Sequence, residues 1–469
     1  MKFTSSPRLP FFLSLAFLAL ALTLIAADEP REIPVPPIAT PMGKLPGVNE
    51  LPARPALPDV LTMNDGTRVT SAAQWPARRA EILRTLEYYA VGQAPAAPGN
   101  VKGRVVKTQS LADGKFTYRL MHLTFGPQEK LSLDIGIYTP AGPGPFPAVI
   151  APAGTPPGAT PLSRLPNGPT QGRGVNVLLV VGGGVASPAA EIPGAGRGPA
   201  DPERIAATNA ALAHGYAYVT FNNNDCGEDT TLREADGSWS FRTTRFFSAY
   251  PGYDWGLLRS WAWGVSRIVD YLVTDPAIAG KKLIVTGASR TGKSAMVAAA
   301  FDERLALGAP VVTGGGGIGA HRFAGPRKSE TLDLMVTKYP NWFSPHLHEF
   351  RGQREKLPFD EHWFLAACAP RAFIALEGDA DAISYPEAVR QSILGAQPAY
   401  ALLGAAEKLG VNYAPHGHAF TADDWSALLD FADKHLLGKS SPRTFDRFPT
   451  EAELDAALAL SAAAAPPRK

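Results

Sequence analysis

The residues with the clearest potential for chemistry lie at positions 281–295, which read KKLIVTGASRTGKSA. An apolar run typical of a strand ends at Gly287, a tight turn carries Ser289, and an alanine-rich run typical of a helix follows. A serine on a strained turn between strand and helix is exposed for nucleophilic attack, and the next backbone N–H can stabilise an oxyanion. The segment therefore indicates a nucleophilic serine, although Thr291 precedes Gly292, so the pattern G-x-S-x-G is missed by one residue.

The same segment allows two other interpretations. Gly287, Gly292, Lys293 and Ser294 satisfy G-x-x-x-x-G-K-[ST], the loop that cradles nucleotide phosphates. The motif lies beyond residue 280 rather than on a first strand, and the chain begins like an exported protein, so a nucleotide site is disfavoured. Ser289 could also be an ordinary N-cap of the following helix. A nucleophile needs a base and an acid as partners, and their presence decides between these interpretations.

Suitable acids and histidines follow the serine in the chain. Residues 372–376 read as a strand that opens into a loop with Asp379 and Asp381. A last strand then leads to His416 and His418. In α/β-hydrolases the nucleophile, the acid and the histidine occur in this order on successive strand ends. The sequence therefore predicts a Ser-acid-His triad, with two candidates for the acid and two for the histidine.

The elements that must hold this triad alternate between short apolar runs and helical stretches. The expected strands are residues 146–153, 177–181, 216–221, 283–286, 310–313, 372–376 and 411–413, and the clearest helices are residues 256–273 and 293–306. This alternation is typical of a parallel sheet covered on both faces. A helix at 75–91 and alternating segments at 101–110, 115–125 and 131–139 come first. We therefore expect an α/β fold of the α/β-hydrolase type, a three-layer αβα arrangement with a β-rich N-terminal extension.

Composition and charge narrow the class of protein. The chain has 469 residues, 45% of them hydrophobic and 19% charged, which suits a large globular core. Its 45 basic and 43 acidic residues nearly cancel, so we expect no binding to nucleic acid or to an anionic membrane. Cys226 and Cys368 are too few for a disulfide framework or a metal site, and we expect both to be free and structural.

The N-terminus predicts export. Residues 1–27 contain two basic residues followed by an uncharged apolar run, which is the form of a secretory signal, with an uncleaved anchor as the alternative. The expected location is therefore secreted or periplasmic. The expected divisions after the signal are a proline-rich segment at 28–60, a catalytic domain at 61–440 and a C-terminal tail at 441–469.

Taken together, these motifs resemble the glucuronoyl esterases, family 15 of the carbohydrate esterases. The family signature G-C-S-R-x-G-K is matched by residues 287–293 at every position except the cysteine, which is Ala288 here. Residues 417–425 resemble the family's histidine segment, which selects His418 over His416. Four further stretches match, at residues 255–272, 314–322, 357–362 and 369–371.

The resemblance implies a serine carboxyl-ester hydrolase that cleaves the ester between (4-O-methyl)glucuronate on xylan and an alcohol of lignin. Ser289 would attack the carbonyl, His418 would take its proton, and an acyl-enzyme would form. Arg290 would stabilise the oxyanion, and Lys293 would hydrogen-bond the sugar hydroxyls. We expect no metal or other cofactor, glucuronoxylan or a lignin-carbohydrate ester as the partner, and a monomer.

The sequence departs from the family in its acid and in its sugar contacts. Many members carry a catalytic Glu where this chain has Val312, so the acid must come from the later loop, with Asp381 the first choice and Asp379 the second. Glu330 is expected to replace a family Glu, and Trp342 is a candidate stacking platform for sugar. Two alternatives stay open: an esterase or deacetylase of other carbohydrate esters, and a non-catalytic carbohydrate-binding relative.

Overall fold

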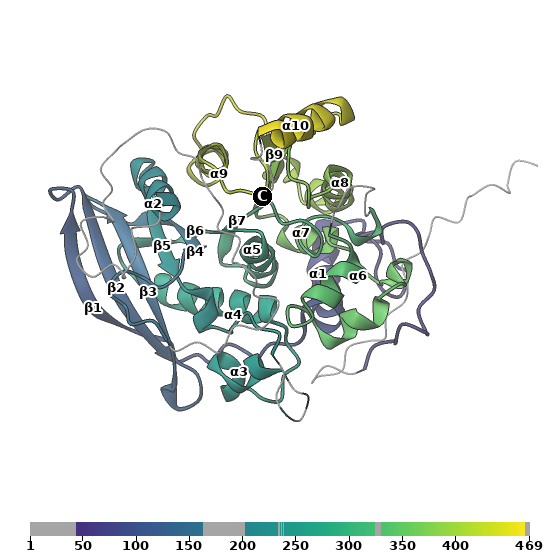
Figure 1. Ribbon diagram of the computed structural model, residues 1–469, viewed down its shortest axis with the longest axis horizontal. Helices are drawn as coiled ribbons and strands as arrows, with labels where there is room; N and C mark the ends of the chain where they lie inside the picture. Colours follow the sequence, from purple (N-terminus) through teal and green to yellow (C-terminus); the bar gives the residue numbers. More distant parts are fainter. Residues whose placement is uncertain are drawn as a thin grey trace, which may run out of the picture.

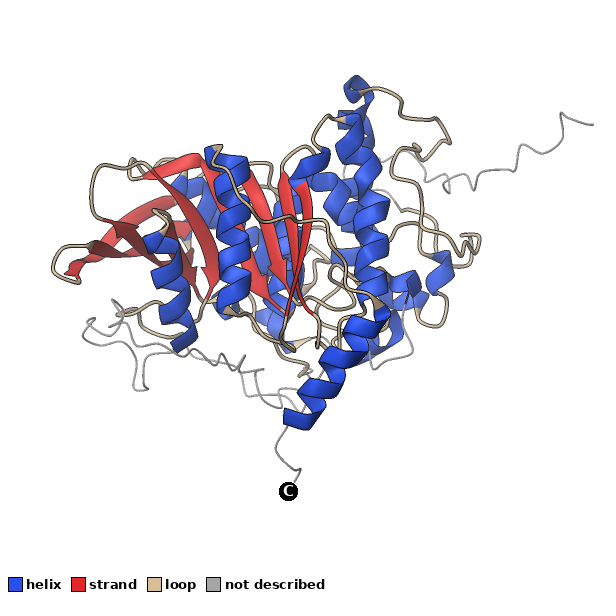
Figure 2. Cartoon of the chain, turned by 90° about the horizontal axis from the view of Figure 1, so that it is seen from above, coloured by secondary structure: helices blue, strands red, loops and turns tan. Residues whose placement is uncertain are grey.

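The computed structural model describes residues 44–162, 202–232, 235, 237, 239–323 and 330–464. Within them, a nine-stranded sheet runs through the molecule in the order β1-β2-β3-β5-β4-β6-β7-β8-β9, with helices on both faces (Figures 1 and 2). The strands are β1 (Lys102–Leu111), β2 (Phe116–Phe125), β3 (Leu131–Pro140), β4 (Phe146–Pro152), β5 (Ala217–Phe221), β6 (Ile278–Ala288), β7 (Leu305–Val311), β8 (Ala372–Gly378) and β9 (Leu409–Ala414). β1, β2 and β3 run antiparallel to their neighbours, whereas β5, β4, β6, β7, β8 and β9 are mutually parallel.

Two apolar cores, one on each face, hold the helices to this sheet. The helices are α1 (Trp75–Thr85), α2 (Pro202–Ala213), α3 (Arg245–Ala249), α4 (Leu257–Leu272), α5 (Arg290–Phe301), α6 (Leu332–Lys338), α7 (His362–Cys368), α8 (Pro386–Leu402), α9 (Ala422–Leu437) and α10 (Glu451–Ala464). Leu283 and Val285 of β6 join one core with α4, α5 and α7, and Ile284 joins the other with α2 and α9. Successive strand residues face opposite sides of a sheet, so this alternation fills both faces. The predicted three-layer α/β fold is confirmed.

Most of the predicted elements form near their expected positions. The helix expected at 75–91 forms α1 and continues as a π-helical turn, η2 (Leu86–Val91). The three alternating N-terminal segments become β1, β2 and β3, which extend the central sheet instead of forming a separate layer. The strand expected at 177–181 lies outside the described residues.

Two boundaries around the middle of the sheet were predicted wrongly. The strand expected at 310–313 is β7, which spans Leu305–Val311. It stops there because Val312 has a φ of +41°, a left-handed conformation that breaks the extended backbone. The helix expected at 293–306 is α5, which begins earlier, directly after Ser289, and ends at Phe301. The strand and the helix are both displaced toward the N-terminus.

The N-terminal segment wraps the surface of the domain where the structure describes it. Leu45, Leu51 and Val60 are buried in the core that contains α1. The Pro58 carbonyl accepts a 3.3 Å hydrogen bond from the indole N–H of Trp363 in α7. The expected signal at 1–27 and the first part of the proline-rich segment lie outside the described residues. None of the helices described is long and apolar enough to span a bilayer.

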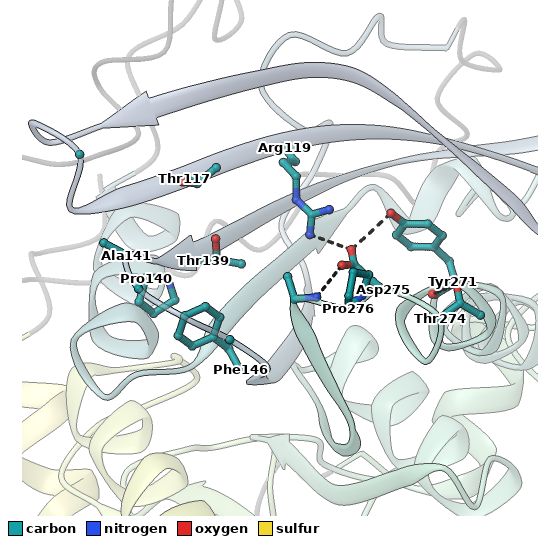
Figure 3. Close-up of a pocket in the computed structure, with 14 residues that line it drawn as sticks. Thr117, Arg119, Thr139, Pro140, Ala141, Phe146, Tyr271, Thr274, Asp275 and Pro276 are labelled. Carbon is teal, nitrogen blue, oxygen red and sulfur yellow. Dashed lines mark hydrogen bonds and ion pairs between the residues drawn. The ribbon is translucent and has the colours of Figure 1, made fainter.

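A polar cavity of about 590 Å³ opens beside the antiparallel strands (Figure 3). Arg119 and Tyr271 both donate hydrogen bonds to one carboxylate oxygen of Asp275 at its wall, at 2.7 and 3.3 Å. Phe146 and Ala277 line it, so it lies at the amino ends of β4 and β6. The expected nucleophile follows the carboxyl end of β6, roughly 30 Å away along an eleven-residue strand. This cavity is therefore separate from the expected catalytic edge.

Replacing Arg322 by Met should destabilise the fold. Arg322 braces a loop: its guanidinium pairs with the buried Asp360 at 2.9 Å and donates to the carbonyls of Phe359 and Leu357. Without it, the Asp360 charge is left buried and unpaired, which costs about 3–5 kcal/mol. Chemical unfolding should register that loss in the free energy of unfolding.

The matched control is Arg447→Met, which breaks the exposed ion pair between Arg447 and Glu453. Exposed pairs contribute about 0–1 kcal/mol, so this variant should unfold close to the parent protein. Equal losses in the two variants would contradict the structural role assigned to Arg322.

Candidate active site

The turn between β6 and α5 holds Ser289 in a strained backbone conformation. Its φ of +54° and ψ of −124° lie outside the regions that residues with a side chain usually occupy. Its N–H donates to the Val311 carbonyl of β7 at 2.9 Å, which ties the turn to the next strand. This is the geometry expected for a nucleophilic serine at a strand end.

Two glycines leave room for this turn. A Cβ on Gly287 would lie 2.7 Å from the Thr291 carbonyl oxygen, and one on Gly292 would lie 2.7 Å from the Gly287 carbonyl oxygen. Both contacts are shorter than real Cβ atoms tolerate. Thr291 sits between them, and its hydroxyl accepts a 3.1 Å hydrogen bond from the Ala288 N–H. Gly292 stands one position later than the second glycine of G-x-S-x-G. Even so, the backbone packs too closely around it for a side chain.

His418 is held by a carboxylate at the same edge of the sheet. Its Nδ1 lies 2.9 Å from Oδ2 of Asp381, whose side chain is fully buried. The Ile383 N–H donates to the other carboxylate oxygen at 3.0 Å, which fixes the carboxylate. If Nδ1 carries the proton donated to Asp381, Nε2 is the basic nitrogen. That Nε2 is buried and makes no hydrogen bond with any described residue.

The structure distinguishes between the paired candidates for acid and histidine. Among the described residues, no hydrogen bond joins the Asp379 side chain to either histidine ring, and its backbone N–H continues the pairing of β8 with β9 by donating to Ala414. His416 is engaged elsewhere: its Nε2 lies 3.1 Å from the Asp424 carboxylate at the start of α9. Burial lowers the pKa of His416, but Asp424 outweighs it and the pKa is raised. Of the four candidates, Asp381 and His418 are hydrogen-bonded to each other.

Ser289 and His418 are positioned by strands of one parallel sheet. Ser289 follows β6, Asp381 follows β8 and His418 follows β9, so all three lie at carboxyl ends. No hydrogen bond joins the Ser289 hydroxyl to His418 in the part of the chain described. Such catalytic hydrogen bonds are often long before substrate binds and shorten in the complex.

Arg290 and Lys293, at the start of α5, are each paired with a carboxylate. Nη1 of Arg290 pairs with Asp229, and Nζ of Lys293 lies 2.9 Å from Oε2 of Glu330. Lys293 also donates to the Thr313 carbonyl, and its side chain is only 1% exposed. Lys293 and Glu330, each expected separately to contact the sugar, are therefore together, although 37 residues separate them in the chain. The Glu330 carboxylate beside the Lys293 ammonium would repel a phosphate, which argues against a nucleotide site here.

Trp342 does not lie where a stacking platform was expected. The residue is 2% exposed, and the Tyr339 ring stacks on it with a centroid separation of 4.0 Å. Its indole N–H donates to Oδ1 of Asp229 at 2.8 Å. The expectation of an exposed ring failed because the loop after α6 folds this side chain inward to satisfy a buried carboxylate. Trp342 supports the site from beneath, and Tyr339 is the more exposed ring of the pair.

Two acids near the site were missed from the sequence. Neither of them is at position 312 after β7, which is a fully buried valine. The first acid, Glu377, is fully buried, and it accepts a 2.9 Å hydrogen bond from the Ser384 hydroxyl. The sequence did contain a signal for it, because a Glu within an apolar strand is expected to be buried. Asp229 lies on the loop after β5, and its contacts with Arg290 and Trp342, 61 and 113 residues away, reveal its relevance.

The described residues contain no group of three or more His, Cys, Asp and Glu side chains that could hold a metal ion. Cys226 and Cys368 are both free and buried, as expected for structural cysteines.

Replacing Glu377 by Gln should make the stability of the protein less dependent on pH. Burial and the nearby charge of Asp381 raise the pKa of Glu377 to about 8. In the unfolded chain a Glu has a pKa of ~4.3, so the folded state binds this proton more tightly. The stabilisation is complete below pH ~4 and is lost as the pH rises through about 8.

Thermal unfolding at pH 5 and pH 8 tests this. The melting temperature should fall less between these values for Glu377→Gln than for the parent protein, while a surface control, Glu407→Gln, should follow the parent. An unchanged fall in Glu377→Gln would mean that Glu377 is ionised in the folded state.

Known proteins resemble this chain over most of its length. Residues 190–404 match the family described as "Glucuronyl esterase, fungi". "Carbohydrate esterase MZ0003", from an unknown prokaryotic organism, is 29% identical over 408 residues, which cover 81% of this chain and 90% of that protein. A 4-O-methyl-glucuronoyl methylesterase of Neurospora crassa is 28% identical, and the match covers 85% of this chain and 86% of that protein.

Solved structures agree with these sequence matches. A promiscuous CE15 esterase from a marine bacterial metagenome superimposes with a TM-score of 0.64 at 27% identity, over 83% of this chain and 98% of that one. A glucuronoyl esterase from Solibacter usitatus, at 23% identity and a TM-score of 0.67, shares the fold over 82% of this chain and 99% of that one. The chain is therefore similar over most of its length to the glucuronoyl esterases, family 15 of the carbohydrate esterases, and is a carboxylic ester hydrolase with an α/β-hydrolase fold.

Proposed function

We propose that this chain is a serine esterase that hydrolyses esters of (4-O-methyl)glucuronic acid, with Ser289, His418 and Asp381 as its triad. The observation that carries the proposal is the 2.9 Å contact between His418 and Asp381, at the sheet edge where Ser289 occupies its strained turn. Relatives named 4-O-methyl-glucuronoyl methylesterases support glucuronate as the acid of the ester.

The proposed reaction proceeds through an acyl-enzyme. Oγ of Ser289 attacks the ester carbonyl while Nε2 of His418 accepts the serine proton, and Asp381 stabilises the imidazolium that forms. The negative charge of the tetrahedral intermediate develops beside the Arg290 guanidinium. As the intermediate collapses, His418 gives the proton to the departing alcohol. Water then attacks the glucuronoyl-serine ester, with His418 again as the base, and releases the acid and free Ser289.

The acid part of the substrate is proposed to contact Lys293 and Glu330. Lys293 lies one helical turn after Ser289, and Glu330 reaches it from just before α6, so the pair can face a sugar bound at the nucleophile. An ammonium and a carboxylate together can donate to and accept from the hydroxyls of one ring. The alcohol is proposed to belong to lignin, which places the substrate in plant cell-wall xylan and the enzyme outside the cytoplasm.

A second candidate is an esterase with a broader range of substrates. One observation favours it: Trp342 is buried, so the site lacks the exposed indole that would select a sugar ring. The structural relative described as a promiscuous esterase is consistent with this possibility. The two candidates share the triad and differ in how strongly the acid part of the ester is recognised.

Hydrolysis of benzyl glucuronate should depend on the proposed triad. Ser289→Ala and His418→Ala should each lower kcat by ~10⁴-fold or more, because the nucleophile and its base act as one unit. Asp381→Asn should lower kcat by ~10²–10⁴-fold, because the amide no longer stabilises the imidazolium. Spectrophotometric or chromatographic detection of released benzyl alcohol measures all three.

Asp379→Asn is the matched control, since Asp379 lies two residues from Asp381 and does not contact His418. It should keep kcat within about a factor of three of the parent, because the carboxylate makes no hydrogen bond with His418 and the change keeps its size. If Asp379→Asn proved as damaging as Asp381→Asn, the assignment of the acid would be wrong. An acetyl ester cleaved while benzyl glucuronate is untouched would select the broader esterase.

Replacing Glu330 by Gln should weaken recognition of glucuronate without removing ester cleavage. The change removes the charge that faces Lys293, and hydrogen bonds to charged groups contribute about 1.5–3 kcal/mol. KM for benzyl glucuronate should therefore rise by ~10-fold or more, whereas kinetics with p-nitrophenyl acetate should stay the same. A parallel loss on both esters would assign Glu330 to the fold instead, and the exposed Glu349→Gln serves as control.

A further inference from the structure

Asp229 lies on the loop that follows β5, at the same sheet edge as Ser289. Two side chains of α4 fix the backbone immediately before it. The Ser260 hydroxyl donates to the Cys226 carbonyl at 3.1 Å, and the Trp261 indole N–H donates to the Gly227 carbonyl at 2.8 Å. Both side chains are buried, so the loop is attached to the core rather than free to move. Asp229 is therefore presented from a rigid part of the domain.

The carboxylate of Asp229 joins two parts of the site. Its Oδ2 pairs with Nη1 of Arg290, and its Oδ1 accepts hydrogen bonds from the Trp342 indole at 2.8 Å and from the Asn341 amide at 3.2 Å. Three donors from two distant segments thus converge on one side chain. Because its residue is only 9% exposed, the carboxylate is oriented by these donors more than by water.

Arg290 depends on this carboxylate for its position. Within the described part of the chain, Asp229 is the one hydrogen-bond partner of its guanidinium, which also lies 5.5 Å from the centre of the Trp342 ring. The Arg290 side chain is 27% exposed, so part of it is accessible from outside the protein. A long side chain held at one end loses little further rotamer freedom when it binds a developing charge.

We propose that Asp229 is a positioning residue that orients the Arg290 guanidinium toward the reacting carbonyl. The inference rests on the proposed role of Arg290 at the oxyanion. Electrostatic stabilisation of a transition state requires donors that are already in place when the charge develops. By fixing Nη1, Asp229 leaves the other nitrogens of Arg290 aimed in a constant direction.

Asp229 could instead weaken catalysis by cancelling the charge of Arg290, and in that case its removal would raise kcat. A carboxylate beside Arg290 partly cancels its charge, so removing the carboxylate would strengthen the oxyanion contact if orientation did not matter. We expect orientation to dominate, because Asp229 is the one hydrogen-bond partner of the Arg290 guanidinium among the described residues and its loss would free the whole side chain to rotate. The sign of the change in kcat therefore separates orientation from charge.

The test compares Asp229→Asn, Arg290→Ala and the double variant in hydrolysis of benzyl glucuronate. Arg290→Ala should lower kcat by ~10²–10³-fold, the usual loss for an oxyanion donor. Asp229→Asn should lower kcat by ~10–50-fold with little change in KM, since the interaction it supports forms only in the transition state. In the Arg290→Ala background, Asp229→Asn should add less than about a further factor of two, because coupled residues are not additive.

The neighbouring Glu228 supplies a matched control. It is a buried carboxylate on the same loop, and it pairs with Arg245 instead of Arg290. Glu228→Gln should keep kcat within about a factor of three, as expected for a substitution outside the site. Unfolding midpoints of all variants confirm that the compared proteins are folded.

Rescue by free guanidinium adds a readout that a purely structural role would not affect. Millimolar guanidinium should restore part of the activity of Arg290→Ala, because Asp229 can bind the small cation where the side chain was. It should restore nothing in the double variant. The proposal is supported if guanidinium rescues Arg290→Ala but not the double variant, and if the losses in kcat of the two single variants do not multiply in the double variant.

Three outcomes would overturn it: Asp229→Asn as fast as or faster than the parent while Arg290→Ala is slow, losses that multiply in the double variant, or equal rescue with and without Asp229. A separate outcome concerns the proposed function itself. If Arg290→Ala hydrolyses benzyl glucuronate as fast as the parent, Arg290 is not the oxyanion cation, whatever Asp229 does.

Discussion

The structure depends on one constraint, the left-handed backbone of Ser289 between β6 and α5. This conformation is costly for a residue with a side chain, and it persists because its surroundings allow nothing else. Gly287 and Gly292 let the turn close on itself, and the hydrogen bond from Ser289 to Val311 ties it to β7. The turn lies at the centre of a parallel sheet with a core on each face, so the scaffold can hold the strain. The other site residues are positioned relative to this point.

Around Ser289, cationic or basic side chains are each matched to a carboxylate from a different loop. Asp229 on the loop after β5 pairs with Arg290, Glu330 before α6 pairs with Lys293, and Asp381 on the loop after β8 holds His418. Parallel strands bring these loops to one edge. Pairing lowers the cost of holding charges in a partly buried site and fixes the side chains before substrate arrives. The arrangement suits a reaction in which negative charge develops on a carbonyl oxygen.

Much of this could be predicted from the sequence, because the signals are local. The apolar runs and helical periods indicated the order of the layers, and the motif around Ser289 indicated a nucleophile followed by candidate acids and histidines. The resemblance to the glucuronoyl esterases then favoured Asp381 and His418 among these candidates. What could not be predicted depends on long-range contacts. Trp342 follows an asparagine on a loop and looked exposed, but its indole satisfies a carboxylate 113 residues earlier in the chain. Asp229 was missed for the same reason, and the end of β7 was misplaced because nothing in its apolar composition marks the reversal at Val312.

The most direct test of the account is labelling with a fluorophosphonate probe, located by peptide mass spectrometry, with and without benzyl glucuronate as competitor. The account predicts one phosphonyl group, on Ser289, whose formation is slowed by the glucuronate ester and abolished in Ser289→Ala. Labelling of a different residue, or ester turnover that survives Ser289→Ala, would contradict the claim that Ser289 is the nucleophile. Labelling of Ser289 that benzyl glucuronate does not slow would leave the nucleophile in place and contradict glucuronate as the acid.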